Sequence, residues 1–153
     1  MPANLVTTAA NDSALRLDNQ LCFALYSASL AMTKVYKPLL EALDLTYPQY
    51  LAMLVLWEQD GASVSALGDR LFLDSGTLTP LLKRMEEKGL LRRQRSAKDE
   101  RRVEVFLTAQ GTALKAQAAR VPACVVAATN VPVPDLMALT QQVQTLRNQL
   151  AKP

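Results

Sequence analysis

The sequence predicts a mainly α-helical protein with a small β-hairpin wing, in the order α-α-α-α-β-β-α-α of a winged helix-turn-helix. Apolar residues recur every three or four positions along most of the 153 residues, and half of all residues are hydrophobic. Near the middle of the chain, two short capped helices precede alternating residues that are typical of a hairpin. The length suits a single domain, residues 1–153, with its own core.

A long first helix is expected over residues 15–43. Its apolar stripe requires burial and consists of Leu17, Leu21, Leu25, Ala28, Met32, Val35 and Leu39. Beside it runs a second stripe of mostly small and polar residues, suited to either a partner helix or solvent: Cys22, Tyr26, Ser29, Thr33 and Tyr36. Pro38 is expected to bend or strain the last turns, because a proline inside a helix removes one backbone hydrogen bond.

Three shorter helices are expected next. Pro48 suits the first position of a helix that opens at residues 46–48 and ends near Gly61. Ser63 is expected to cap a short helix over residues 63–71, and Asp74 a longer one over residues 75–88. The apolar residues of this longer helix share one face, and its opposite face carries Gly76, Thr79, Pro80 and Lys83.

A hairpin and two further helices complete the chain. One strand begins at Leu91, and alternating apolar residues predict a return strand over residues 103–107. Thr108 is expected to cap a helix that runs past Cys124 with a kink at Pro122. A break at residues 131–134 precedes a last amphipathic helix over residues 135–150.

Basic charge is concentrated in one stretch. Between Lys83 and Arg102 nine residues are basic and four are acidic, although the whole chain has a net charge of only +3. Charge alone fits either a solvated face or a nucleic-acid footprint. Together with the expected topology it predicts DNA binding, with the second short helix in the major groove and the hairpin along the backbone or minor groove.

The composition excludes several functions. The chain has no histidine, which removes Ser-His-Asp and Cys-His catalysis and any histidine-ligated metal, so we expect no metal and no cofactor. The two cysteines, Cys22 and Cys124, are too far apart in sequence for a zinc motif. No apolar run approaches the ~20 residues of a membrane span, and residues 1–18 lack a signal-peptide pattern. A soluble, cytoplasmic protein that is not an enzyme is therefore expected.

The run LFLDSGTLTPLLKRMEEKGLLRRQRSAKDERRVEVFLTAQG resembles the DNA-binding core of the MarR family. The resemblance implies that Asp99 braces the wing through basic side chains and that Arg101 contacts double-stranded operator DNA. It also implies a homodimer held together by residues 15–45 and 109–151, with residues 46–108 binding DNA. The full set of DNA contacts that we expect is Ser75, Gly76, Thr77, Thr79, Pro80, Lys83, Arg84, Arg93, Arg95, Lys98 and Arg101.

The segment LDNQLCFALYSASL, with Tyr36 and Tyr47 downstream, resembles one branch of that family, the organic hydroperoxide resistance regulators. Cys22 is expected in the first turn of its helix, where partial positive charge favours the thiolate that attacks a peroxide. Tyr36 lies 14 residues further on, about 21 Å along the same helix, and cannot touch the Cys22 of its own chain. The resemblance implies that Tyr36 and Tyr47 stabilise the thiolate across the dimer. The alternative is that both tyrosines are ordinary packing residues.

With Cys124 in the C-terminal region, the chain looks like the two-cysteine type of this branch, and the resemblance implies a disulfide between Cys22 and the partner subunit's Cys124. The apolar neighbours of Cys124 equally suit an inert core thiol. The resulting expectation is a homodimeric repressor that an organic hydroperoxide induces to release its operator, so that a peroxide-detoxifying gene is expressed. The apolar neighbours of Cys22 favour alkyl or lipid hydroperoxides as the inducer. Three alternatives remain open: a repressor responding to a small aromatic acid, a thiol peroxidase, and a sequence-neutral chromosomal protein.

Overall fold

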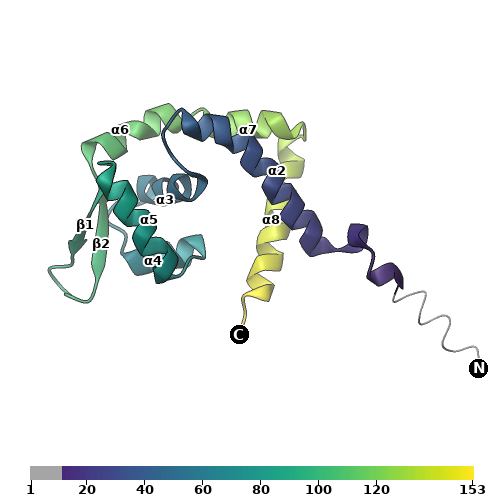
Figure 1. Cartoon of the computed structure of the whole chain (residues 1–153), viewed down its shortest axis with the longest axis horizontal. Coiled ribbons are helices and arrows are strands. Elements are labelled where there is room, and N and C mark those ends of the chain that lie inside the picture. Colours follow the sequence, from purple (N-terminus) through teal and green to yellow (C-terminus); the bar gives the residue numbers. More distant parts are fainter. Residues whose placement is uncertain (1–11) are drawn as a thin grey trace, which may run out of the picture.

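The computed structural model of the chain describes residues 12–153. Its element order confirms the predicted winged helix-turn-helix, with one additional break in the C-terminal half (Figure 1). In chain order the elements are η1 (Leu17–Asn19), α2 (Leu21–Glu41), α3 (Tyr47–Glu58), α4 (Val64–Leu71), α5 (Ser75–Glu87), β1 (Leu91–Arg95), β2 (Val103–Leu107), α6 (Ala109–Ala118), α7 (Val121–Thr129) and α8 (Val133–Leu150).

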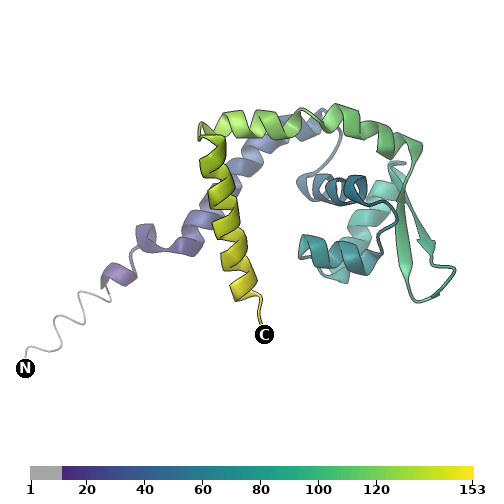
Figure 2. The same cartoon turned by 180° about the vertical axis from the view of Figure 1, so that it is seen from behind.

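The elements form a compact lobe and a helical frame (Figures 1 and 2). Helices α3, α4 and α5 and the antiparallel β1–β2 hairpin make up the lobe, and a short bridge between Ser63 and Glu104 joins the hairpin to the start of α4. In both views α6 and α7 run nearly in line, and α7 lies beside α2. Helix α8 then turns away, at 97° to the segment Ala109–Thr129. The lobe therefore joins the frame mainly through α2 and α6.

One apolar core fixes the orientation of α5. Its fully buried side chains come from α3, α4, α5 and both strands and include Met53, Leu56, Leu67, Leu78, Leu82, Met85, Leu91 and Val105. The predicted inner face of the helix over residues 75–88 is thereby confirmed, because Leu78, Leu81, Leu82 and Met85 are all buried. Since these side chains occupy one face, the opposite face of α5 is exposed to solvent.

Side-chain caps set the starts of α3, α4, α5 and α6, and those at Ser63, Asp74 and Thr108 confirm the prediction. Thr46 and Gln49 form a reciprocal capping box at α3, in which each side chain accepts a hydrogen bond from the backbone of the other. Ser63, Asp74 and Thr108 each accept a hydrogen bond from a backbone N–H in the first turn of α4, α5 and α6. These bonds satisfy donors that a helix otherwise leaves without a partner.

The first long helix begins later than predicted. Residues 17–19 form a separate 3-10 turn, and the extended backbone of Gln20 interrupts the helix before Leu21. The Gln20 side chain donates to the carbonyl oxygens of Ala14 and Arg16, which stabilises this break. As a result Cys22 is the second residue of α2, closer to the helix start than expected.

The C-terminal half also differs from the prediction. In place of one helix kinked at Pro122, α6 ends at Ala118 and α7 begins at Val121. Pro122 lies in the first turn of α7, where a missing N–H removes no helical hydrogen bond. The last helix begins at Val133, with Pro134 in its first turn for the same reason.

The apolar stripe of α2 is only half covered. Met32, Val35 and Leu39 pack against the core. Within residues 12–153 the earlier part of the stripe remains at the surface, with Leu21 59% and Leu25 37% exposed. Helix α8 also exposes apolar side chains, including Met137, Leu139 and Val143. Such contiguous apolar surface is typical of a site for a macromolecular partner.

Within the described residues no single helix is long and apolar enough to cross a membrane. The segment Ala109–Thr129 and α8 reach the required length and composition only when they are taken together, and they are bent by 97° relative to each other. The expected absence of a signal peptide concerns residues 1–18, of which residues 1–11 lie outside the described part of the chain.

Replacing Gly111 by alanine is expected to destabilise the lobe by about 3 kcal/mol. A Cβ atom at this position would collide with the carbonyl oxygen of Leu90, and the Gly111 carbonyl also accepts the indole N–H of Trp57 at 3.0 Å. Urea unfolding measures the difference. Gly76→Ala is the control, because its Cβ would lie 3.5 Å from the nearest atom and alanine favours helix. Equal stability of the two variants would contradict the close packing of α6 on residue 90.

Candidate functional site

The outer face of α5 forms the first part of the candidate site. Asp74 accepts the backbone N–H of Thr77 at 2.8 Å. Hydrogen bonds from the backbone and the side chain of Thr77 lower the pKa of the Asp74 carboxyl group. The helix starts at Ser75, so Pro80 lies in its second turn. Seven of the predicted DNA contacts are exposed along this helix: Ser75, Gly76, Thr77, Thr79, Pro80, Lys83 and Arg84.

The tip of the wing is held by backbone hydrogen bonds. Asp99 accepts the backbone N–H of Arg101 at 3.0 Å, and its carbonyl oxygen accepts the backbone N–H of Arg102 at 2.9 Å. Asp99 thus braces the turn through main-chain groups, whereas the resemblance implied bracing through basic side chains. Arg95, Lys98 and Arg101 are all exposed around this turn.

Arg93 differs from the other predicted DNA contacts. Its backbone N–H donates to Glu86 at 2.7 Å and its guanidinium to the other carboxylate oxygen at 3.2 Å, which lowers the pKa of Glu86. Leu91, Arg93 and Arg95 share one face of β1, and Leu91 belongs to the core, so Arg93 is directed at α5. Arg93 therefore ties the wing to the helix and is a weaker candidate for DNA contact. The sequence contained a signal for this role, because Arg93 lies two residues from the apolar Leu91 and therefore on the same face of the strand.

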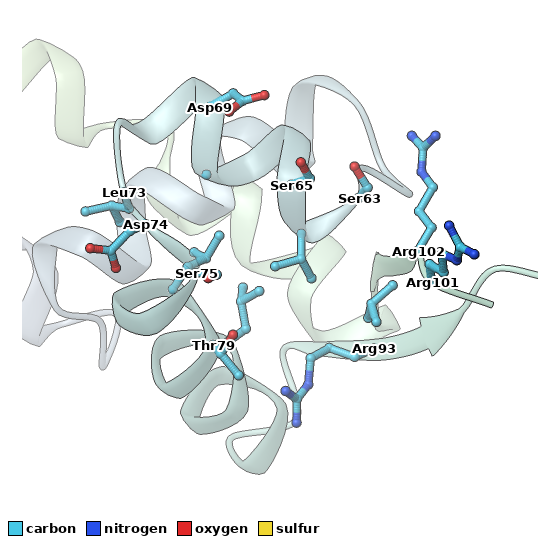
Figure 3. A pocket seen from close by; sticks show the side chains of 15 residues that line it. Ser63, Ser65, Asp69, Leu73, Asp74, Ser75, Thr79, Arg93, Arg101 and Arg102 are labelled. Atoms are coloured by element: carbon cyan, nitrogen blue, oxygen red, sulfur yellow. The ribbon is translucent and has the colours of Figure 1, made fainter. Parts of the chain in front are cut away.

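A cavity of about 500 Å³ lies between α4, α5 and the wing (Figure 3). Ser63 and Ser65 line it from the start of α4, and Ser75 and Thr79 from α5. Arg101 and Arg102 lie at its far side, beyond Ser63. Ser65 and Arg102 are absent from the predicted DNA contacts, because tertiary contacts such as the bridge between Ser63 and Glu104 bring the start of α4 to the wing.

Three tyrosines form the second part of the site. The ring centroid of Tyr36 on α2 lies 5.0 Å from that of Tyr47 and 5.9 Å from that of Tyr50, both on α3. The structure therefore brings together the two tyrosines that the sequence singled out. It adds Tyr50, which is only 3% exposed. Its spacing of three residues from Tyr47 on one helix was the available signal.

The phenols of this cluster hold their protons tightly. Burial raises the pKa of all three hydroxyl groups, and for Tyr36 the neighbouring Tyr47 and Tyr50 raise it further. At neutral pH each side chain is therefore protonated and able to donate a hydrogen bond to an anion.

Cys22 lies near the opposite end of α2 from the tyrosine cluster. Cys22 and Cys124 are both free, and both are exposed. Helix α2 is unbroken from Cys22 to Tyr36, so the 14 residues between them span about 21 Å. Cys124 lies on α7 between the buried Val121 and Val125, with its own side chain at the surface, so it is not a core thiol of this chain.

Comparisons with known proteins agree with this architecture. The sequence model of the family described as transcriptional regulator SarA/Rot matches residues 34–118. The organic hydroperoxide resistance transcriptional regulator of Bacillus subtilis (strain 168) is 50% identical over 132 residues, which cover 86% of this chain and 90% of the relative.

Solved structures extend the likeness to nearly the whole chain. Reduced AbfR bound to DNA matches with a TM-score of 0.77 at 30% identity, over 93% of this chain and 99% of that chain. Disulfide-formed AbfR matches with a TM-score of 0.60 at 32% identity, over 91% and 98% of the two chains. AbfR is a protein of Staphylococcus epidermidis.

The fold and these likenesses define a winged helix-turn-helix transcriptional regulator and not an enzyme. Within that class, the chain belongs to the MarR-type family of organic hydroperoxide resistance regulators, as the sequence motifs predicted.

The raised tyrosine pKa values predict a loss of stability at high pH. Above the ordinary value of 10.0 the unfolded chain releases phenol protons that the folded chain retains. The contribution of the three tyrosines to the free energy of unfolding is therefore complete below pH 10, and it is lost as the pH rises through their folded pKa values. We expect the free energy of unfolding to fall between about pH 10 and 12, less steeply in Tyr36→Phe. Urea unfolding at stepped pH tests this, with the 62% exposed Tyr26 changed to Phe as the control. Identical slopes in wild type and Tyr36→Phe would be the contrary result.

Proposed function

We propose that the chain is a homodimeric cytoplasmic repressor that binds double-stranded operator DNA and releases it when an organic hydroperoxide oxidises Cys22. One observation carries this proposal. An intact helix holds the exposed Cys22 about 21 Å from a cluster of protonated phenols in the same chain. Only a second copy of the chain can bring such a tyrosine cluster to the Cys22 thiol.

DNA binding rests on α5 and the wing. The core leaves the predicted outer face of α5 free, and its small side chains allow the backbone to approach base edges in the major groove. Arg95, Lys98 and Arg101 extend the contact to phosphates or the minor groove, with Asp99 bracing the turn. Beside α5, the hydroxyl groups of Ser63 and Ser65 and the guanidinium of Arg102 line the same cavity and supply donors for a backbone phosphate. The match to reduced AbfR bound to DNA supports this arrangement.

Dimerisation rests on residues 15–45 and 109–151, with residues 46–108 forming the DNA-binding region. The first half of α2 and much of α8 present apolar side chains that the chain itself does not cover. Burying these faces against a second copy around a two-fold axis removes them from water. The same axis brings the partner subunit's Tyr36 and Tyr47 to Cys22.

The chemistry is a two-electron oxidation of sulfur. The Cys22 thiolate attacks the terminal oxygen of the hydroperoxide, the O–O bond breaks, and the alkoxide leaves as an alcohol after taking a proton from a phenol or water. Cys22 becomes a sulfenic acid. The thiol of the partner subunit's Cys124 then attacks this sulfur, water leaves, and a disulfide links the subunits. The exposure of Cys124 supports this resolving role.

Release of DNA follows from a change of shape. A disulfide requires the Cα atoms of Cys22 and the partner subunit's Cys124 to lie within about 7 Å, and we infer that drawing these two helices together moves the DNA-binding lobes. The chain is more similar to the reduced, DNA-bound form of AbfR than to its disulfide form, with TM-scores of 0.77 and 0.60. We therefore assign the present conformation to the repressing state, and oxidation leads to expression of a peroxide-detoxifying gene.

Arg101→Ala is expected to weaken DNA binding and to reduce the slope of log affinity against log salt by about 1, because one phosphate contact is lost. Arg93→Ala is expected to leave the slope unchanged, since Glu86 already neutralises that guanidinium. Fluorescence anisotropy at four salt concentrations measures both slopes. Lys115→Ala, which removes an exposed lysine on α6, is the control. A slope that changes for Arg93 and not for Arg101 would reverse these assignments.

The redox switch is tested by anisotropy of labelled promoter DNA with reduced protein, titrated with cumene hydroperoxide and then treated with dithiothreitol. We expect wild-type protein to release the DNA and to bind it again after reduction. Cys22→Ser should remain bound throughout, whereas Cys124→Ser should lose or slow the reversible release. A non-reducing gel should show a linked dimer for the wild type only. If wild-type protein ignores the peroxide, the sensing function is wrong and only DNA binding remains.

A further inference from the structure

The end of α5 is fastened to the start of α3 by one lysine. Lys88 is the C-cap residue of α5. Its ammonium group donates to the carbonyl oxygen of Asp44 at 2.6 Å and to Oε1 of Gln49 at 3.2 Å, and lies 3.8 Å from the Asp44 carboxylate. One side chain thereby joins the loop after α2, the first turn of α3 and the last turn of α5.

The acceptors of Lys88 are themselves held in place. Gln49 is 3% exposed, and the same Oε1 atom accepts the backbone N–H of Thr46 in the capping box of α3. Asp44 has a positive φ of 54°, a conformation that costs energy for a residue with a Cβ and that turns the chain between α2 and α3. A movement of the first turn of α3 must therefore move or break the contacts of Lys88.

This first turn also carries the phenols. Gln49 lies between Tyr47 and Tyr50, whose rings contact Tyr36 of α2. A short path therefore joins the ring of Tyr47 to the C-cap of α5. It runs along the α3 backbone from Tyr47 to Gln49, through the Gln49 side-chain amide, and on to Lys88. The opposite end of the same helix carries Ser75 and Gly76 on the proposed DNA face.

We propose that Lys88 is a positioning residue that couples the tyrosine cluster to the orientation of α5, and so transmits oxidation of Cys22 to the DNA-binding surface. The proposal rests on the proposed function. Hydrogen bonds from an ammonium group are directional and stronger than those between neutral groups. They resist a relative shift of α3 and α5 more than the apolar contacts that these helices also share. Coupling between two sites is reciprocal, so bound DNA must in turn restrain the first turn of α3.

Two variants with opposite expected effects test this coupling. Lys88→Met keeps the length of the side chain and removes the donor. Gln49→Glu keeps the acceptor that caps α3 and adds a charge facing Lys88. The measured quantity is the Kd for DNA of the peroxide-oxidised protein divided by the Kd of the reduced protein. Allosteric coupling typically gives a ratio of roughly 5–150.

We expect this ratio to fall toward 1 in Lys88→Met, whose oxidised form keeps its DNA, and to be maintained or increased in Gln49→Glu. Lys152→Met, which removes the charge of an exposed lysine outside the proposed dimerisation and DNA-binding regions, should match the wild type. The rate of Cys22 oxidation should be unchanged in Lys88→Met. A general loss of structure would change this rate, so the measurement separates the two effects. A wild-type ratio in Lys88→Met overturns the proposal. So does loss of DNA binding by its reduced form, which would make Lys88 a structural support of α5.

A measurement without peroxide separates this proposal from the proposed function. Hydrogen exchange of residues 46–50 is followed in reduced protein, with and without promoter DNA. We expect DNA to slow this exchange in the wild type and to have little effect in Lys88→Met. A wild-type protein that ignores peroxide but shows this protection would retain the coupling and lose the sensing function. Equal protection in both proteins would overturn the coupling.

Discussion

The straightness of α2 is the constraint on which the rest of this molecule depends. An α-helix without a break from Leu21 to Glu41 holds Cys22 and Tyr36 at a fixed separation of about 21 Å. The thiol at one end therefore cannot meet the phenols at the other within one chain. The same rigidity leaves the first half of the helix with apolar side chains and no core to cover them. Both features support the proposed homodimer, in which sensing and assembly have one physical origin.

The lobe meets a different requirement, which is to present one helix face outward. Four buried side chains of α5 anchor its inner face, and the Glu86–Arg93 contact fixes the wing beside it. Lys88 then joins the far end of α5 to the turn that carries Tyr47 and Tyr50. A single helix is thus connected to the proposed DNA surface at its start and to the tyrosine cluster at its end.

Local chemistry was the most predictable part of the fold. Caps at Ser63, Asp74 and Thr108 act within three residues of themselves, and all three lie where the sequence placed them. The predictions differed from the structure where contacts between elements decide. The start of α2 depends on hydrogen bonds of Gln20 to residues before it, and the division between α6 and α7 has no local marker beyond Pro122. Arg93 was assigned to DNA because the sequence shows its charge but does not show its contact with Glu86.

The sequence by itself determined the winged helix-turn-helix, its family, the distance between Cys22 and Tyr36, and the polar outer face of α5. The fold, the distance and the outer face follow from periodicity, capping and helix geometry, which are properties of neighbouring residues, whereas the family follows from the resemblance of the motifs. Only the tertiary structure decided that Tyr50 joins Tyr36 and Tyr47, that Arg102 lies opposite Ser63 and Ser65, and that Lys88 reaches Gln49. Each of these contacts joins separate elements, and the packing of the core, not the local sequence, sets how such elements meet.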